Sequence, residues 1–270
     1  MSISIQKEPV HLPLENHNHD YMGIYDRNRL YVSDKEQQKI KTVKILLGGA
    51  GIGSVIAECA LRFGFERITI VDGDKVELSN LNRQNYTHAD IGKYKAEVLA
   101  KRLLKINPKA EISFRNEFID KENIYEIIKG HDIAVNALDF QSDIPFEFDR
   151  ICGEMGIHIL HPYNFGWASL LTVIRPGGYQ FNELSEEYEG FELRIAEFVV
   201  RNNSFWNIKQ EWLKEVVNKY KMEKETLPPP QLSVGSWLVA GKCVDVMFNI
   251  INDRKVLYFP KFYLTSIHDA

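Results

Sequence analysis

The chain has 270 residues, 44% of them hydrophobic, and a formal net charge of −4. This length and composition suit one large domain with a substantial core. The slight acidic excess excludes the overall positive field on which non-specific nucleic-acid binding depends, so we expect no nucleic-acid partner.

Residues 1–20 show little periodicity, and we interpret them as a flexible N-terminal arm. They have the pattern of neither a secretion signal nor a transit peptide, and no uninterrupted apolar run in the chain is long enough to span a bilayer. We therefore expect a cytoplasmic protein with no membrane partner. Cys59, Cys152 and Cys243 lack C-x-x-C spacing, so neither a disulfide framework nor a zinc site is expected.

Residues 21–40 have a polar helical pattern, in which Ser33 and Glu36 have the spacing of a capping box. After them, apolar runs alternate with helical patterns. Strands are expected at 42–49, 66–74, 110–118, 131–139 and 157–165, and helices at 53–64, 92–108, 121–130 and 145–156. Strands separated by helices of this length predict parallel pairing with right-handed crossovers. The expected fold class is α/β, with a Rossmann-like, doubly wound, mainly parallel sheet.

The pattern changes after Gly166. The segments expected there are a strand and turn at 168–181, two charged helical pieces within 191–225, an apolar helix after the prolines at 228–230, and C-terminal strand residues at 256–267. We interpret residues 21–270 as a single domain with a nucleotide-binding core at 42–165 and a helical insertion at 190–227.

Gly48, Gly51 and Gly53 lie where the first strand turns into a helix. Such a turn lets a phosphate approach the backbone and presents free amides at the positive end of the helix. The G-x-x-G-x-G spacing differs from the G-x-G-x-x-G of dinucleotide enzymes, so a packing role for these glycines stays open. Asp72 follows about twenty residues later at a strand end, where a carboxylate can bind the ribose of NAD or of ATP.

The polar stretch "DGDKVELSNLNRQ" favours ATP. A nicotinamide coenzyme has no evident need for so many donors beyond its ribose, whereas a triphosphate under attack needs cationic and amide donors around its charge. The residues of this loop assigned to the nucleotide are Asp72, Asp74, Ser79, Asn80, Leu81, Asn82, Arg83 and Gln84.

Two residues outside this loop extend the site. Lys95, in "IGKYKAE" at a helix start, is suited to bring an ammonium to the phosphates. Asp139 ends a strand at the carboxyl edge of the sheet, where ligands of such sheets bind, and is suited to bind Mg²⁺ through oxygen. The alternatives are a solvated helix-face lysine and a helix N-cap, respectively.

With these motifs the sequence resembles the ThiF/MoeB/HesA adenylyltransferases, bacterial relatives of the ubiquitin-activating enzymes. The resemblance runs from about Tyr25 to Ile251, and "DGDKVELSNLNRQ" with "IGKYKAE" is its most specific part. It implies that a substrate carboxylate attacks the α-phosphate of ATP, releasing pyrophosphate and leaving an acyl adenylate. The carboxylate would belong to the C-terminus of a small ubiquitin-like sulfur carrier protein or to a peptide.

The resemblance also implies residue roles. Asp72 would hold the ribose, and Asn80, Arg83 and Lys95 would surround the triphosphate.

Three further roles are implied in the same way. Asp139 would carry Mg²⁺, with Phe140 beside the nucleotide. Arg27, in "YDRNR", would reach into the site of a neighbouring subunit, so that the active unit is a homodimer. The alternative for Arg27 is a solvated helix surface.

The chain departs from the family in two respects. Many members carry two C-x-x-C zinc pairs, which are missing here, so zinc is not expected. Members that pass the acyl group to their own cysteine keep it in a loop that corresponds to 175–190, which has no cysteine here. A separate amine, thiol or sulfur donor, or internal cyclisation of the substrate, is therefore expected to consume the adenylate.

Two other functions stay open at this point. One is an NAD-dependent oxidoreductase on the same fold, and the other is a non-catalytic nucleotide-binding scaffold. The helical insertion and the stretch "HPYNFGWASL" are candidates for substrate recognition, with ordinary packing as the alternative for both.

Overall fold

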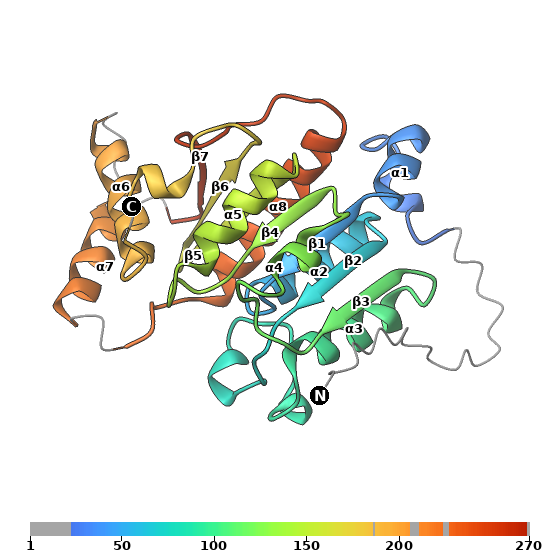
Figure 1. Ribbon diagram of the computed structural model, residues 1–270, viewed down its shortest axis with the longest axis horizontal. Helices are drawn as coiled ribbons and strands as arrows, with labels where there is room; N and C mark the ends of the chain where they lie inside the picture. Colours follow the sequence, from blue (N-terminus) through green and yellow to red (C-terminus); the bar gives the residue numbers. More distant parts are fainter. Residues whose placement is uncertain (1–22, 186, 206–210, 224–226, 269–270) are drawn as a thin grey trace.

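A computed structural model of the chain describes residues 23–185, 187–205, 211–223 and 227–268. The arm expected at residues 1–20 lies outside this part of the chain, as do pieces of the expected helical insertion. Within the described residues, seven strands form one sheet in the order β3-β2-β1-β4-β5-β6-β7 (Figure 1).

The sheet is mainly parallel. β1 to β5 pair in parallel, and β6 and β7 extend the sheet with antiparallel pairing. The strands are β1 (Lys44–Gly48), β2 (Arg67–Val71), β3 (Glu111–Arg115), β4 (Ile133–Asn136), β5 (His158–Phe165), β6 (Ala168–Ile174) and β7 (Phe262–Ser266). The predicted α/β class, with C-terminal strands added to a parallel sheet, is confirmed.

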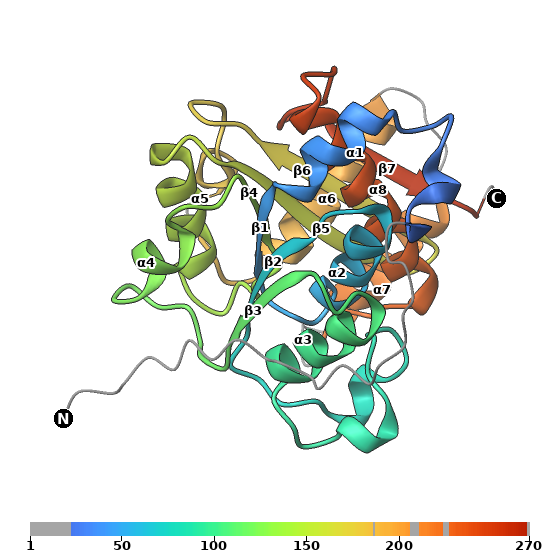
Figure 2. The ribbon, with the colours of Figure 1, turned by 90° about the vertical axis from the view of Figure 1, so that its right-hand side faces the viewer.

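Helices cover both faces of this sheet. Figure 2 shows α4 and α5 on one face, and α2, α3 and α8 on the other. The helices are α1 (Asp34–Lys41), α2 (Gly53–Phe63), α3 (Lys95–Ile106), α4 (Ile124–Ile128), α5 (Ile144–Glu154), α6 (Phe191–Phe205), α7 (Glu211–Met222) and α8 (Ser233–Ile251). This is the predicted doubly wound arrangement.

Side-chain alternation along β1 supplies both cores. Ile45 and Leu47 belong to the apolar cluster that contains the inner faces of α2, α3 and α8. Leu46, between them, belongs to the cluster formed with α4 and α5. Because neighbouring residues of a strand point to opposite faces, a strand covered on both sides is apolar throughout. Phe191 and Ile195 of α6 belong to the second cluster, so this part of the insertion packs into the domain.

Local signals fix several element ends. Ser33 and Glu36 form the predicted capping box at the start of α1, and Gly64 ends α2 with a φ of +125°. The helix expected over 21–40 is shorter than predicted. Its described first part forms turns and a 3-10 helix at Asp26–Asn28, because Ser33 caps a helix that begins only at Asp34.

Among the described residues, the helix α8 is long and apolar enough to cross a membrane by length and composition alone. Half of its apolar stretch, 50%, is buried inside the fold. α8 packs against α2, β5 and β6, and this packing accounts for its apolar composition.

Candidate nucleotide site

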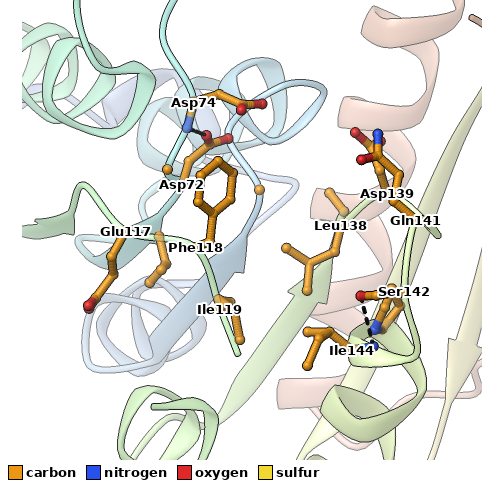
Figure 3. Close-up of a pocket in the computed structure, with 15 residues that line it drawn as sticks. Asp72, Asp74, Glu117, Phe118, Ile119, Leu138, Asp139, Gln141, Ser142 and Ile144 are labelled. Carbon is orange, nitrogen blue, oxygen red and sulfur yellow. Dashed lines mark hydrogen bonds between the residues drawn. The ribbon is translucent and has the colours of Figure 1, made fainter. Parts of the chain in front are cut away.

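The chain changes direction across the sheet next to β1. It passes from β1 to β2 and β3 on one side and then returns to β4 on the other. Ligands of such sheets bind at the carboxyl ends of the strands beside this reversal. A cleft of about 290 Å³ lies there. One wall carries Asp72, Asp74 and Phe118, and the other carries Leu138, Asp139 and Ser142 (Figure 3).

The fold itself requires two adjacent glycines, the last residue of β1 and the residue that follows it. Gly49 has a φ of +96°, and a Cβ there would lie 2.4 Å from the carbonyl oxygen of Ala137. Gly48 serves packing, since its Cβ would lie 3.3 Å from the ring of Phe148. The glycine that the turn requires is therefore Gly49, which the motif spacing did not single out. The signal available in the sequence was a pair of adjacent glycines at a strand end.

The next two glycines, at the start of α2, differ in the space around them. A Cβ on Gly53 would meet no atom within 4 Å, and one on Gly51 would meet the side chain of Gln84 at 3.3 Å. Within the described part of the chain, the backbone amides of Gly51, Ile52 and Gly53 have no hydrogen-bond acceptor. Free amides at the positive end of a helix suit an anion.

Asp72 ties together the two loops that frame the cleft. Its Oδ2 accepts a hydrogen bond from the amide of Ala50 at 2.6 Å, and its Oδ1 accepts one from the amide of Asp74 at 2.7 Å. Burial raises the pKa of the Asp72 carboxyl, while these amides and the Lys95 ammonium act in the opposite direction. Each oxygen keeps a further lone pair that can accept from a ribose hydroxyl.

Lys95 and two carboxylates gather beside the cleft. Lys95 begins α3, is 8% exposed, and places its Nζ 3.0 Å from Oδ2 of Asp74. Asp139 opens to the cleft after β4, and partial burial by the surrounding protein raises the pKa of its carboxyl. The charges of Lys95, Asp74 and Arg83 all act on Asp139 as well. The structure thus brings these predicted residues together.

Arg83 is oriented by neutral acceptors. Its Nε donates to Oε1 of Gln231 at 2.6 Å, and its Nη1 donates to the Ser79 carbonyl at 2.8 Å and to Oδ1 of Asn82 at 2.9 Å. Among the residues that the structure describes, Nη2 has no hydrogen-bond partner. Partial burial lowers the pKa of the guanidinium, and Asp139 acts against this shift. Arginine nevertheless stays protonated in proteins, so Nη2 offers a charged donor.

The other predicted loop residues support the loop rather than the cleft walls. Asn80 is buried and accepts the Glu77 amide at 2.9 Å through its Oδ1, while Leu81 packs against the core. The Ser79 hydroxyl lies 3.4 Å from the carboxylate of Glu77. Gln84 has a buried Oε1 with no hydrogen-bond partner, next to the glycine turn.

Apolar residues complete the cleft, and none of them was among the predicted site residues. Phe118 is 67% exposed and lies against Gly73, where a Cβ would come within 2.6 Å of its ring. Leu138 and Ile144 line the opposite wall (Figure 3). An exposed phenylalanine facing aliphatic side chains suits the flat face of a purine base. The sequence signal was the apolar pair Phe118 and Ile119 directly after a strand end.

Phe140 lies in the hydrophobic core rather than in the cleft. It is 6% exposed, and its ring stacks on that of Phe191 with a centroid separation of 4.5 Å. Its neighbours Asp139 and Gln141 line the cleft in its place. The resemblance implies that the nucleotide lies beside Phe140. In the structure, however, the Phe140 side chain packs against α6.

Arg27 lies far from the cleft of its own chain. It is exposed within the 3-10 helix Asp26–Asn28, and this segment is fastened to the C-terminal end of α2. Tyr25 donates to the Leu61 carbonyl at 3.3 Å, and Asn28 donates to the Phe63 carbonyl at 2.9 Å. Since α2 starts at the glycine turn and its 11 residues span about 16 Å, Arg27 sits at the opposite edge of the sheet.

The surroundings of the three cysteines disfavour the reactive thiolate form. Cys152 and Cys243 are buried, and burial raises the pKa of both thiols and of Cys59. Within the described ranges, no group of three or more His, Cys, Asp and Glu side chains is arranged to hold a metal ion.

The fold and this cleft define a doubly wound α/β protein with an open cleft at the carboxyl edge of its sheet. The model of the ThiF family matches residues 25–193, so the chain belongs to the ThiF family.

Relatives in this family carry several activities. The chain is 30% identical over 128 residues to the tRNA threonylcarbamoyladenosine dehydratase of Haemophilus influenzae, covering 47% of this chain and 48% of that one. It is 34% identical over 110 residues to the sulfur carrier protein adenylyltransferase of Thermus thermophilus, covering 40% and 41%. The chain spans about half or less of the length of these relatives.

Solved structures show the same fold. Escherichia coli MccB in complex with AMPCPP and MccA superposes with a TM-score of 0.63 at 18% identity, covering 93% of this chain and 72% of MccB. PaaA superposes with a TM-score of 0.68 at 19% identity, covering 95% of this chain and 83% of PaaA.

Proposed function

We propose that the protein is an ATP-dependent adenylyltransferase that activates a carboxylate as an acyl adenylate. The observation that carries this proposal is the grouping of Arg83, Lys95 and Asp139 beside one cleft that also holds Asp72. A redox coenzyme needs no such charges around its reacting atoms, whereas a breaking triphosphate does. The adenylyltransferases among the relatives support the same reaction class.

In the proposed reaction, one oxygen of the substrate carboxylate forms a bond to the α-phosphorus of ATP. The bond from that phosphorus to the bridging oxygen breaks, and pyrophosphate leaves with the electron pair. The substrate supplies its own nucleophile, so the protein needs no activated side chain for this step. Its contribution is to hold the two reactants in line and to offset negative charge, through the free Nη2 of Arg83, the Lys95 ammonium and the amides before α2.

Asp139 is the residue proposed to hold Mg²⁺. Its carboxylate has no hydrogen bond or ion pair in the described part of the chain, and it is open to the cleft. Magnesium is commonly held by one or two carboxylates together with substrate phosphates, so a single free carboxylate fits. When bound, the ion would supply charge neutralisation on the phosphates.

The proposed substrate is the C-terminal carboxylate of a ubiquitin-like sulfur carrier protein or of a peptide. The Thermus relative is named for sulfur carrier proteins, and the MccB structure contains MccA. Because residues 175–190 have no cysteine, the adenylate would pass to a separate acceptor or cyclise.

We also propose a cytoplasmic homodimer in which Arg27 of one copy completes the site of the other. The support is the position of Arg27 at the sheet edge opposite its own cleft, where it is exposed for contact with a second chain.

Exchange of labelled pyrophosphate into ATP tests the reaction directly. The purified protein is assayed with a sulfur carrier protein ending in Gly-Gly and with peptides encoded near its own gene. We expect pyrophosphate exchange that requires a free C-terminal carboxylate on the substrate. The exchange should disappear when that C-terminus is amidated. Thermal stabilisation by NADH but not by ATP would instead support the oxidoreductase.

A further inference from the structure

Gln231 lies outside every motif of the sequence, yet it contacts the arginine assigned to the triphosphate. We propose that Gln231 is a positioning residue for Arg83: it fixes Nε through a neutral acceptor, so that the charge and the free Nη2 group stay available to the phosphates. This inference rests on the proposed function and identifies what sets the geometry of that site.

The two cations beside the cleft are held in different ways. The Lys95 ammonium pairs with a carboxylate, Oδ2 of Asp74, at 3.0 Å. The acceptors around Arg83 are all uncharged, and the shortest contact is the one from its Nε to Oε1 of Gln231 at 2.6 Å. A neutral acceptor restricts the direction of the guanidinium without offsetting its charge.

A positioning residue must itself have a fixed position. The backbone around Gln231 is fixed by neighbouring prolines and by hydrogen bonds. The three prolines at 228–230 restrict the backbone before it. Its own carbonyl accepts a hydrogen bond from Nδ2 of Asn82 at 3.3 Å. The next carbonyl, that of Leu232, accepts one from Nδ2 of Asn164 at 2.7 Å. The segment is thus fastened on one side to the Arg83 loop and on the other to the end of β5.

Gln231→Glu separates positioning from mere packing. The variant keeps the size of the side chain and the acceptor, but it replaces a neutral oxygen with a carboxylate against the guanidinium. An ion pair would then compete with the phosphates for Arg83, so ATP affinity should fall although the contact is retained. Gln231→Ala removes the contact and should weaken ATP binding less than the carboxylate does.

The experiment is calorimetric titration of the full chain with ATP plus Mg²⁺ and, separately, with adenosine. For Gln231→Glu we expect ATP affinity to fall about tenfold, a change typical of one charged contact, with adenosine affinity unchanged. Gln38→Glu, an exposed residue of α1 at the far end of the fold, adds the same charge and should change neither. In an Arg83→Ala background, Gln231→Glu should have no further effect on ATP.

The inference is overturned if Gln231→Glu binds ATP as the unchanged protein does, or if it loses adenosine affinity as strongly as ATP affinity. The second outcome would mean that Gln231 only supports the fold of the cleft. An unchanged protein that binds ATP no better than adenosine would overturn the proposed function and this inference with it.

Discussion

The two halves of the sheet use their ionisable side chains differently. Around the carboxyl ends of β1, β2 and β4, charged groups such as Asp139 border an open cleft. In the second half, His161 of β5 and Asp149 of α5 form a pair with 2.9 Å between Nε2 and Oδ1, and their side chains are 1% and 2% exposed. The first arrangement leaves ionisable groups open to a ligand, whereas the second encloses them within the protein. The comparison indicates where ligand chemistry and where fold stability should respond to substitution.

The largest expected effect is on stability in the second half. His161→Leu removes the ring that contacts the Asp149 carboxylate and leaves that buried group without this partner. The free energy of unfolding should fall by about 3 kcal/mol, as for a buried acceptor that loses a hydrogen-bond partner. Urea unfolding followed by circular dichroism measures it. His158→Leu, a half-buried histidine on the same strand, should cost about 1 kcal/mol or less; equal losses for both variants would remove the contrast.

The next effect concerns the cleft. Asp139→Asn should lower pyrophosphate exchange about a hundredfold, as for loss of one charge-stabilising group. The stability should not fall, because the folded protein disfavours the charged form of this carboxyl. Asp143→Asn is the matched control, since Asp143 lies in the same loop and pairs with Lys121 at the surface. If both variants exchange pyrophosphate equally well, Asp139 has no part in the reaction.

A smaller effect is expected for the base subsite. Phe118→Ala should weaken adenosine binding about tenfold, which is the usual contribution of stacking on an aromatic ring. Since Phe118 is 67% exposed, its loss should change the melting temperature little. Tyr125→Ala, 54% exposed on α4, is the control and should leave adenosine binding intact. Unchanged affinity in the Phe118 variant would place the base elsewhere.

The smallest effect is a pH dependence. The pKa of Asp139 in the folded protein is raised above its usual value of 3.8. A raised carboxyl pKa favours the folded state below 3.8 and disfavours it as the pH rises through the folded-state value. Asp139→Asn cannot titrate, so its stability advantage over the unchanged protein should grow from pH 4 upward and then level off. Unfolding free energies measured across this range would contradict the assignment if the difference stayed constant.

Much of the fold was predictable because its signals are local. The capping box of Ser33 and Glu36, the left-handed glycine that ends α2, and the alternation of apolar strands with amphipathic helices each depend on neighbours within a few residues. The same holds for Asp72 and Asp139, since strand ends place both at one sheet edge.

The remainder depends on contacts between distant segments. Gln231 meets Arg83 across 148 positions of the chain, and no spacing rule connects a residue after three prolines with a polar loop. Phe140 follows a cleft residue directly, yet the aromatic rings of α6 draw it into the core. Phe118 is apolar in the sequence and exposed in the structure, because the sheet edge leaves it beside the cleft.

Arg27 lies near the C-terminal end of α2, far from the glycine turn of its own chain. The dependence of activity on protein concentration therefore tests whether Arg27 acts in the cleft of a second chain. If Arg27 of one chain completes the cleft of the other, dimer formation is required for activity. Specific activity should then decline as the protein is diluted below the concentration at which two chains associate. Mixing an inactive Arg27→Ala chain with an inactive Asp139→Asn chain should then restore turnover, because one of the two clefts in a mixed pair keeps both residues intact.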